Sequence, residues 1–288
     1  MKASIGELSA RGLIFSTKWA AELLISLPDQ PTTTTKEQPK MMMMMNQESQ
    51  EPKVIFAKAL FDSREFRRAA NVLEPTETEE SEGGVGGGNL FERNGIAAFI
   101  RSQSLYLAGE KRKSEQMTDS SSHRKAVKQS QKPGMKGQLQ VMTRKEEQQK
   151  MAIVVENEEL GKIKEELEGR KKKRRVMKKI AKIGEDEDDA FLGYMMGVVL
   201  RELGDVDGAK REMISSVNRF PNNVSAWFDL ARMCTSFGEA VGMAKGATAV
   251  LRPHWMAEFF VARAAIETQS HSEAKGLISV LIEKFPRS

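Results

Sequence analysis

The sequence predicts an all-α protein in which helical hairpins stack into a solenoid interrupted by long disordered linkers. Apolar residues recur at helical spacing in several blocks. The last third of the chain resembles itself at an offset of 65 residues, with small residues at matching positions. Hydrophobic residues make up 40% of the 288 residues and charged residues 30%, which is typical of apolar helices separated by solvated spacers.

The first predicted element is an amphipathic helical segment over residues 4–28, where leucines and a tryptophan recur near helical spacing. It ends at Pro28, because proline cannot continue a helix. Residues 29–52 contain four threonines and five consecutive methionines, so we predict a low-complexity linker there.

Residues 53–110 are predicted to form a degenerate repeat pair with a glycine-rich linker over 75–94. A charged break at Asp62–Glu65 separates two helices of a hairpin, and a further helix over 91–108 is expected to end at Gly109. The apolar faces of the hairpin consist of Phe56, Ala57, Leu60 and Phe61 on one helix and Phe66, Ala69, Ala70 and Leu73 on the other.

Residues 111–152 are polar and rich in Lys, Gln and Ser, so we predict a disordered linker. Residues 153–189 are predicted to form a charged helix, with Leu160, Ile163 and Leu167 as a narrow apolar stripe, followed by a basic and then acidic connector. The acidic part is Glu185–Asp189, and the centre of the basic run consists of Lys171, Lys172, Lys173, Arg174 and Arg175.

Three interpretations of this basic run stay open. It is a candidate nuclear-import signal, a solvated helix surface, or a site that neutralises nucleic-acid phosphates. No aromatic residue interleaves the run, so it offers no stacking platform for single strands. Nucleic acid is therefore the least favoured partner.

Residues 190–286 are predicted to hold three tetratricopeptide-like repeats. Ala209-Lys210 is followed after nine residues by Phe220-Pro221, and Ala274-Lys275 is followed in the same way by Phe285-Pro286. The 65-residue offset between these pairs is close to two repeats of roughly 34 residues each. A third, shorter unit lies between them and begins near Val224.

The packing of these repeats follows from residue size. Antiparallel helices approach closely only where a side chain is absent or small, glycine favours the turn, and proline stops the second helix. The residues predicted to carry this packing are Gly197, Gly204, Ala209, Pro221, Trp227, Ala231, Ala262, Ala274 and Pro286. Bulky residues are expected to fill the layers between helices: Leu200, Leu203, Met213, Val217, Val261, Ile278 and Leu281.

The middle unit carries Gly238, Gly242 and Gly246, which a spacing of four places on one helix face. Two interpretations are open. The glycines form a groove where a partner helix approaches closely, or they belong to a weak helix that its neighbours hold in place.

Few residues of the chain are suited to catalysis or to binding a metal or cofactor. Cys234 is the single cysteine, which excludes an internal disulfide and a cysteine-cluster metal site, and the three histidines are scattered. No Ser/His/acid set, zinc-protease motif or nucleotide fingerprint is present. We therefore predict no catalytic, cofactor-binding or metal-binding residues. Cys234 is expected to pack in the core and His254 to cap or pack at a helix start.

No run approaches the roughly 20 apolar residues that a membrane span requires, so we expect no membrane contact.

A resemblance to a known family narrows the classes of function that remain. Five stretches, in order along the chain, resemble the N-terminal part of the anaphase-promoting complex subunit 8 family: Arg11–Leu24, Ala57–Asp62, Ser104–Lys111, Gly193–Arg201 and Glu258–Ala262.

The resemblance implies a non-catalytic structural subunit of a ubiquitin ligase complex that acts in mitotic progression in the nucleus and cytoplasm. It implies contacts with other subunits and with the coactivator, and a homodimer formed through N-terminal repeats. The spacers at 29–52, 75–94 and 112–150 are long for the family. The chain stops at Ser288 where the family continues through further repeats, so we expect a fragment, a truncated product or a partial gene model.

The alternative is a free-standing tetratricopeptide adaptor that grips a short peptide, such as a chaperone tail. Such adaptors present Lys, Arg and Asn on the concave face of their first helices to hold a carboxylate. Here the equivalent positions include Tyr194, Val198 and Phe259, and only Arg263 is basic. That composition weakens the adaptor hypothesis.

Overall fold

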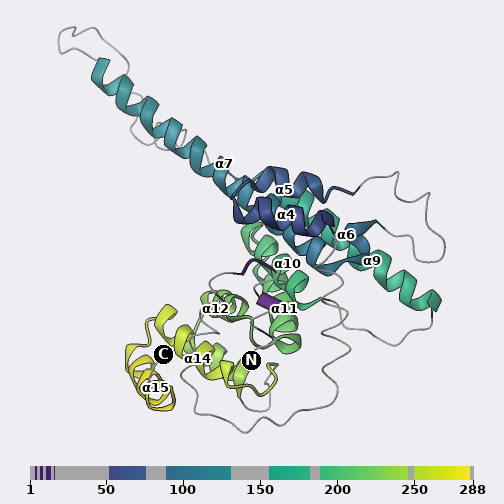
Figure 1. Ribbon diagram of the computed structural model, residues 1–288. Helices are drawn as coiled ribbons and strands as arrows, with labels where there is room; N and C mark the ends of the chain where they lie inside the picture. Colours follow the sequence, from purple (N-terminus) through teal and green to yellow (C-terminus); the bar gives the residue numbers. More distant parts are fainter. Residues whose placement is uncertain are drawn as a thin grey trace.

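The computed structural model describes residues 52–75, 89–130, 156–181, 189–245 and 250–285, together with 4, 7, 8, 11–13 and 16. Throughout these ranges the chain forms helices and turns, with no β-strand. The helices follow one another in an elongated array (Figure 1). The predicted all-α fold of stacked helical hairpins is confirmed, whereas most of the predicted linkers at 29–52 and 75–94 lie outside the described residues.

The first hairpin consists of α4 (Pro52–Asp62) and α5 (Phe66–Val72), and both helices pack on α7. Its core contains Val54, Ala57, Leu60, Phe61, Ala69, Leu73, Leu90, Ile96, Ala97 and Ile100. Phe56 departs from the expected apolar face, since it is 51% exposed beside the equally exposed Ile55.

Two asparagine caps set the start of α6 (Leu90–Arg93) and α7 (Gly95–Ser130). The side chain of Asn89 accepts a hydrogen bond from the backbone N–H of Phe91, and that of Asn94 from Ala97. The predicted helix end at Gly109 is wrong, because α7 continues to Ser130 and projects from the body (Figure 1). The expected disordered linker is therefore helical over 111–130, and Gly109 instead makes room for Asn157.

Helix α9 (Leu160–Ala181) packs on α7 and α10 and carries the basic run within it, rather than in a connector. The predicted stripe of Leu160, Ile163 and Leu167 is buried. Arg101 of α7, only 1% exposed, donates to both carboxylate oxygens of Glu166 at 2.9 and 2.7 Å. Because the charge is paired as it is buried, this contact fixes α9 against α7.

Three further hairpins follow: α10 (Ala190–Glu202) with α11 (Val206–Arg219), α12 (Val224–Arg232) with α13 (Phe237–Ala244), and α14 (Met256–Glu267) with α15 (His271–Lys284). Side chains of Asp189, Asp205 and Ser236 cap α10, α11 and α13 by accepting backbone N–H groups. The three units lie where the 65-residue repeat predicts them.

Small residues lie at the closest crossing of these hairpins. A β-carbon on Gly197 would stand 2.7 Å from Cγ of Met213 and 3.3 Å from the carbonyl oxygen of Ala209. Gly204 has a φ of +86°, the left-handed conformation that ends α10. Five other packing residues are buried, Ala209, Trp227, Ala231, Ala262 and Ala274; Pro221 is half-buried and Pro286 lies outside the described residues.

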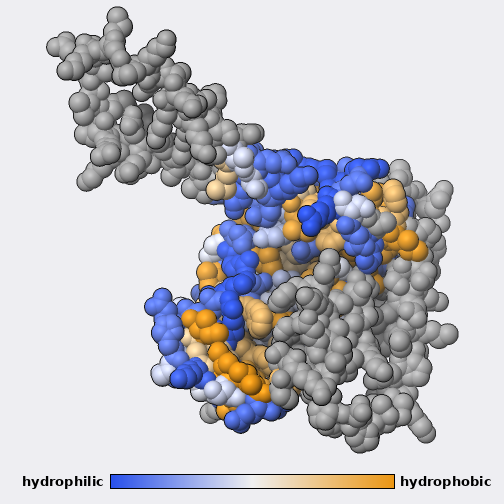
Figure 2. All heavy atoms as spheres, turned by 60° about the vertical axis from the view of Figure 1, so that its left-hand side comes forward, coloured by the Kyte–Doolittle hydropathy of each residue, from blue (hydrophilic) through white to orange (hydrophobic). Residues whose placement is uncertain are grey.

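Most of the bulky residues expected between layers are buried, but two are not. Leu203 is 46% exposed, because it is the cap residue before the left-handed Gly204 and leaves the apolar face of α10. Ile278 is 36% exposed on α15, where Val280 and Ile282 are 57% and 59% exposed. Figure 2 shows hydrophobic surface over these C-terminal helices.

The glycine-bearing helix α13 is only two turns long and packs on α14. A β-carbon on Gly238 would have Oγ of Ser236, at 3.9 Å, as its one neighbour within 4 Å. Gly246 lies outside the described residues. The glycine at 238 is therefore not required for a close approach within the described part of the chain.

The start of the chain packs on the first of the three C-terminal hairpins. Leu8 is fully buried in the same core as Phe191. The guanidinium of Arg11 lies 4.0 Å from the centre of the Phe191 ring and 3.6 Å from a carboxylate oxygen of Asp189. Most of the predicted helical segment 4–28 lies outside the described residues.

Candidate protein-interaction surface

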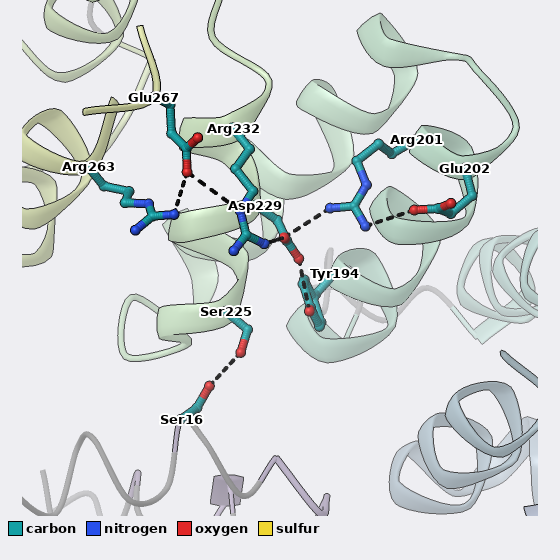
Figure 3. Close-up of polar contacts among 9 residues, drawn as sticks. All are labelled: Ser16, Tyr194, Arg201, Glu202, Ser225, Asp229, Arg232, Arg263 and Glu267. Carbon is teal, nitrogen blue, oxygen red and sulfur yellow. Dashed lines mark hydrogen bonds and ion pairs between the residues drawn. The ribbon is translucent and has the colours of Figure 1, made fainter. Parts of the chain in front are cut away.

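Three arginines lie near the C-terminal ends of the first helices of successive hairpins. Arg201 is on α10, Arg232 on α12 and Arg263 on α14, each 31 residues after the one before. Their side chains are 26%, 54% and 34% exposed. We call them the arginine ladder. Stacking of the hairpins brings these equivalent positions onto one face (Figure 3).

Asp229 of α12 joins Arg201 and Arg232, the first two arginines of the ladder. One of its carboxylate oxygens pairs with Arg201 at 2.9 Å and with Arg232 at 3.0 Å. The other accepts a hydrogen bond from the hydroxyl of Tyr194 at 3.1 Å. The carboxylate is 11% exposed, so this contact between α10 and α12 is shielded from water.

Glu267 of α14 joins Arg232 and Arg263, the second and third arginines of the ladder. It pairs with Arg263 on its own helix and lies 3.7 Å from Nε of Arg232. The guanidinium of Arg263 also lies 5.7 Å from the centre of the Phe228 ring of α12. A continuous line of alternating charges therefore crosses all three hairpins.

The two tyrosines beside the ladder stay protonated at neutral pH. Burial, followed by the negative charge of Glu202, raises the pKa of Tyr106 to about 12. Burial and the carboxylate of Asp229 raise the pKa of Tyr194 still further. Tyr194 therefore acts as a hydrogen-bond donor that orients Asp229, and neither hydroxyl suits a general base.

At the other end of the first helices, the start of the chain contacts the second hairpin. The hydroxyl oxygens of Ser16 and Ser225 are 2.7 Å apart (Figure 3). The side-chain amide of Asn222 donates to Ser4 at 2.8 Å. These contacts place the N-terminal residues along the beginning of α12, whereas the ladder lies at its end.

Cys234 and His254, which the sequence singled out for their reactive side chains, make structural contacts. Cys234 is buried and its thiol donates to the carbonyl of Leu230; burial, then Glu239, raise its pKa to about 11. His254 accepts the backbone N–H of Met256 at 3.2 Å, and burial lowers its pKa. The expectations of core packing and helix capping are confirmed.

The basic run is partly held against neighbouring helices. Lys171 pairs with Glu212 at 2.8 Å, and Lys173 pairs with Glu92. Lys172 and Arg175 are exposed and Arg174 is half-buried. The import-signal interpretation stays a prediction.

Within the described ranges, no group of three or more His, Cys, Asp and Glu side chains is arranged to hold a metal ion. None of the described helices is both long and apolar enough to cross a membrane.

Of the ladder itself, the sequence pointed only to Arg263, together with the neighbouring Tyr194; the roles of Arg201 and Arg232 were missed. The equal 31-residue spacing of Arg201, Arg232 and Arg263 is a signal that could have found it. The acidic partners Asp229 and Glu267 do not share that spacing, so their contribution depends on the three-dimensional stacking.

Comparison with known proteins gives one family. The family model described as "Anaphase promoting complex subunit 8 / Cdc23" matches residues 1–288. The chain is 26% identical over 306 residues to "Anaphase-promoting complex subunit 8" of Arabidopsis thaliana, covering 95% of the chain and 42% of that protein. It is 29% identical over 264 residues to "Cell division cycle protein 23 homolog" of Homo sapiens, covering 92% of the chain and 34% of that protein. The chain thus spans less than half the length of these relatives.

Proposed function

Because the chain belongs to the anaphase promoting complex subunit 8 / Cdc23 family, we propose that it is a non-catalytic scaffold subunit of the anaphase-promoting complex. In that role it supports ubiquitin-dependent degradation in mitotic progression through protein–protein contacts alone. The observation that carries the proposal is the arginine ladder, a charged seam over three stacked hairpins whose arginines are held by Asp229 and Glu267.

The arginine ladder supports the proposed scaffold function for two reasons. Its ion pairs through Asp229 and Glu267 fix the three first helices relative to one another, so a partner meets a preformed surface. The half-exposed Arg232 offers planar donors on that surface. Other subunits of the complex and the coactivator are the proposed partners.

We also propose that the chain pairs with a second copy of itself through its N-terminal helices, within residues 4–110. The support is a pair of adjacent apolar side chains on α4, Ile55 and Phe56, each 51% exposed. Light scattering after gel filtration tests this. The double variant Ile55→Ser/Phe56→Ser is expected to shift the mass toward the monomer. The matched variant Val280→Ser/Ile282→Ser on α15 is expected to leave the dimer intact; equal effects would contradict the proposal.

The proposed work in cell division implies a nuclear as well as a cytoplasmic pool. Lys171–Arg175 is the proposed import signal, with Lys172, Lys173 and Arg175 as its exposed members, of which Lys173 pairs with Glu92. A fluorescent fusion carrying Lys172→Ala/Arg175→Ala should lose nuclear enrichment in interphase cells. Unchanged enrichment would assign nuclear entry to another signal or to a partner.

The adaptor alternative requires cations that are available to a peptide carboxylate. The ladder arginines are instead paired with Asp229, Glu267 and Glu202, which offsets their charge. Titration with acidic C-terminal peptides distinguishes the two functions, since the scaffold proposal expects no saturable binding of such peptides.

Affinity purification from dividing cells, followed by mass spectrometry, tests the scaffold proposal. The tagged chain is expected to bring down other subunits of the ubiquitin ligase. An Arg232→Glu variant is expected to recover less of them, whereas Arg211→Glu, at an exposed arginine of α11 outside the ladder and the basic run, serves as the control. Recovery of the chain as a monomer without those subunits would contradict the proposal, as would ubiquitin transfer by the purified chain alone.

A further inference from the structure

The described residues at the start of the chain form a strap across the junction between the first hairpin and the C-terminal hairpins. We call them the N-terminal strap: Ser4, Glu7, Leu8, Arg11, Gly12, Leu13 and Ser16. Gly12 has a φ of +68°, and the backbone N–H of Leu13 donates to the carbonyl of Leu8 at 3.0 Å, which is the hydrogen bond of a helix-ending turn. Leu8 is fully buried and Leu13 packs against the same core, so both sides of the turn are anchored.

The N-terminal strap contacts three helices that are far apart in the sequence. A β-carbon on Gly12 would stand 2.8 Å from Cε1 of Phe61, so a ring of α4 lies directly against this glycine. The guanidinium of Arg11 lies over the ring of Phe191 in α10. The two polar contacts described above join the strap to the beginning of α12. The strap therefore links the first hairpin to two of the helices that carry the arginine ladder.

Buried polar atoms without partners oppose this closed arrangement. Within the described part of the chain, Nε of Arg11 is buried and has no hydrogen-bond partner. The same holds for both the oxygen and the nitrogen of the Asn223 side chain, a residue that is 1% exposed. Asn223 stands in the sequence between Asn222 and Ser225, which both contact the strap. Because a buried polar group without a partner loses its hydration for nothing, closure is disfavoured at two places.

We propose that the N-terminal strap opens and closes reversibly while the hairpins stay folded. Opening removes the link between α4 and α10, hydrates the buried polar atoms and uncovers the beginnings of α10 and α12. Such local openings need less free energy than global unfolding. The opening is a property of the chain alone, so it does not depend on the proposed scaffold function.

Alkylation of a thiol introduced by Ser16→Cys in the full chain tests the proposal. Ser16 is fully buried and its hydroxyl faces that of Ser225 (Figure 3), so the thiol reacts when the strap opens. Mass spectrometry after timed exposure to iodoacetamide gives the rate at several urea concentrations below the unfolding transition. We expect a rate well below that of the denatured chain and nearly constant with urea, because a local opening exposes little surface. A rate that rises with urea as steeply as global unfolding would overturn the proposal, as would a rate equal to that of the denatured chain.

Two glycine variants in the Ser16→Cys chain separate strap opening from general loss of stability. Gly12→Ala places a side chain against Phe61 in a left-handed conformation, so the thiol should react about tenfold faster or more. The rate at the native Cys234 of α12 should stay within about twofold. Gly276→Ala on α15 is the control, since no atom lies within 4 Å of its added carbon, and it should change neither rate by more than about twofold. Equal effects of the two variants, or equal acceleration at Cys234, would overturn the proposal.

An Asn223→Ala variant tests the part given to the unpartnered polar atoms. The Asn223 side chain makes no capping hydrogen bond to α12, so its removal takes no cap away. The variant should favour the closed strap and slow alkylation at position 16. Faster alkylation would overturn the claim that these atoms oppose closure.

A disulfide provides the complementary measurement on a locked strap. The hydroxyl oxygens of Ser16 and Ser225 are 2.7 Å apart, so Ser16→Cys/Ser225→Cys in a Cys234→Ser chain should form an intramolecular bond on mild oxidation. Hydrogen–deuterium exchange at the beginnings of α10 and α12 should be slower in the oxidised than in the reduced form. Identical exchange in the two forms would overturn the proposal, and so would a product of twice the chain mass, because the strap would then close on another copy.

Discussion

The side-chain oxygen Oδ1 of Asn157 lies 1.8 Å from the point where a β-carbon on residue 109 would stand, so only glycine fits at Gly109. At this close approach, both ends of the Asn157 side-chain amide form hydrogen bonds. Its amide nitrogen donates to the carbonyl of Tyr106 at 3.0 Å and to Glu110 at 3.1 Å, and its oxygen accepts the backbone N–H of Glu159. The residues that lead into α9 are thereby fastened to the middle of α7.

Replacing this glycine is expected to destabilise the fold. Gly109→Ala would displace Asn157 and break hydrogen bonds in a buried place, so we expect a loss of about 1–3 kcal/mol in the free energy of unfolding. Chemical denaturation followed by circular dichroism measures it. Gly169→Ala in α9 is the control, because no atom lies within 4 Å of its added carbon. That variant should gain up to about 1 kcal/mol of helix stability. Equal effects at the two sites would contradict the role given to Asn157.

A second prediction concerns the turn of the last hairpin. Gln269 stands 65 residues after Gly204, and both have a positive φ, +58° and +86°. A side chain in this left-handed conformation costs about 1–2 kcal/mol. Gln269→Gly is therefore expected to raise the free energy of unfolding by up to about 1 kcal/mol, after the added freedom of the unfolded chain is counted. Thermal denaturation measures the change. A lower melting temperature in this variant would show that Gln269 makes a favourable contact that outweighs the strain.

A third prediction concerns alkaline pH. Tyr106 and Tyr194 are the two tyrosines of the chain, so phenolate absorbance reports on them directly. Their folded-state pKa values are raised, to about 12 for Tyr106, above an ordinary value of about 10. They therefore contribute stability that is present below pH 10 and is lost as the pH rises through the folded-state pKa. Phenolate should form near pH 10 in the denatured chain and only at higher pH in the folded one. Tyr194→Phe should make unfolding less sensitive to alkaline pH; identical titrations of folded and denatured chain would contradict this.

The single thiol provides a fourth prediction. Burial of Cys234 raises its pKa to about 11, and the thiolate is the reactive form. Because each unit of pKa changes the thiolate population about tenfold, alkylation at pH 8 should be about a hundredfold slower in the folded chain than in urea. Mass spectrometry after timed exposure to iodoacetamide measures both rates. Similar rates would place Cys234 on an accessible surface.

The hairpins after Ala190 could be predicted from sequence because their rule is local and repeated. Small Gly197 and Ala209 meet at a crossing, and a 65-residue copy of the pattern contains Ala262 and Ala274. Periodicity and residue size alone therefore locate both outer units, and the middle unit fills the distance between them.

The extent of α7 and the ladder could not be predicted in the same way. A glycine after an apolar run usually marks a helix end, but Gly109 is required by Asn157, which is far away in sequence. The ladder depends on Asp229 and Glu267, which occupy different helical positions in their repeats. Such contacts exist only after stacking, so they have no signature within one segment of sequence.

Hydrogen–deuterium exchange of the full chain, alone and with the purified anaphase-promoting complex, tests the scaffold account most directly. The account predicts slower exchange on binding in peptides from α10, α12 and α14, centred on the ends that carry Arg201, Arg232 and Arg263. It predicts little change along the outer part of α7. Unchanged exchange throughout the three hairpins, with no association by gel filtration, would contradict the claim that the stacked first helices are a docking surface.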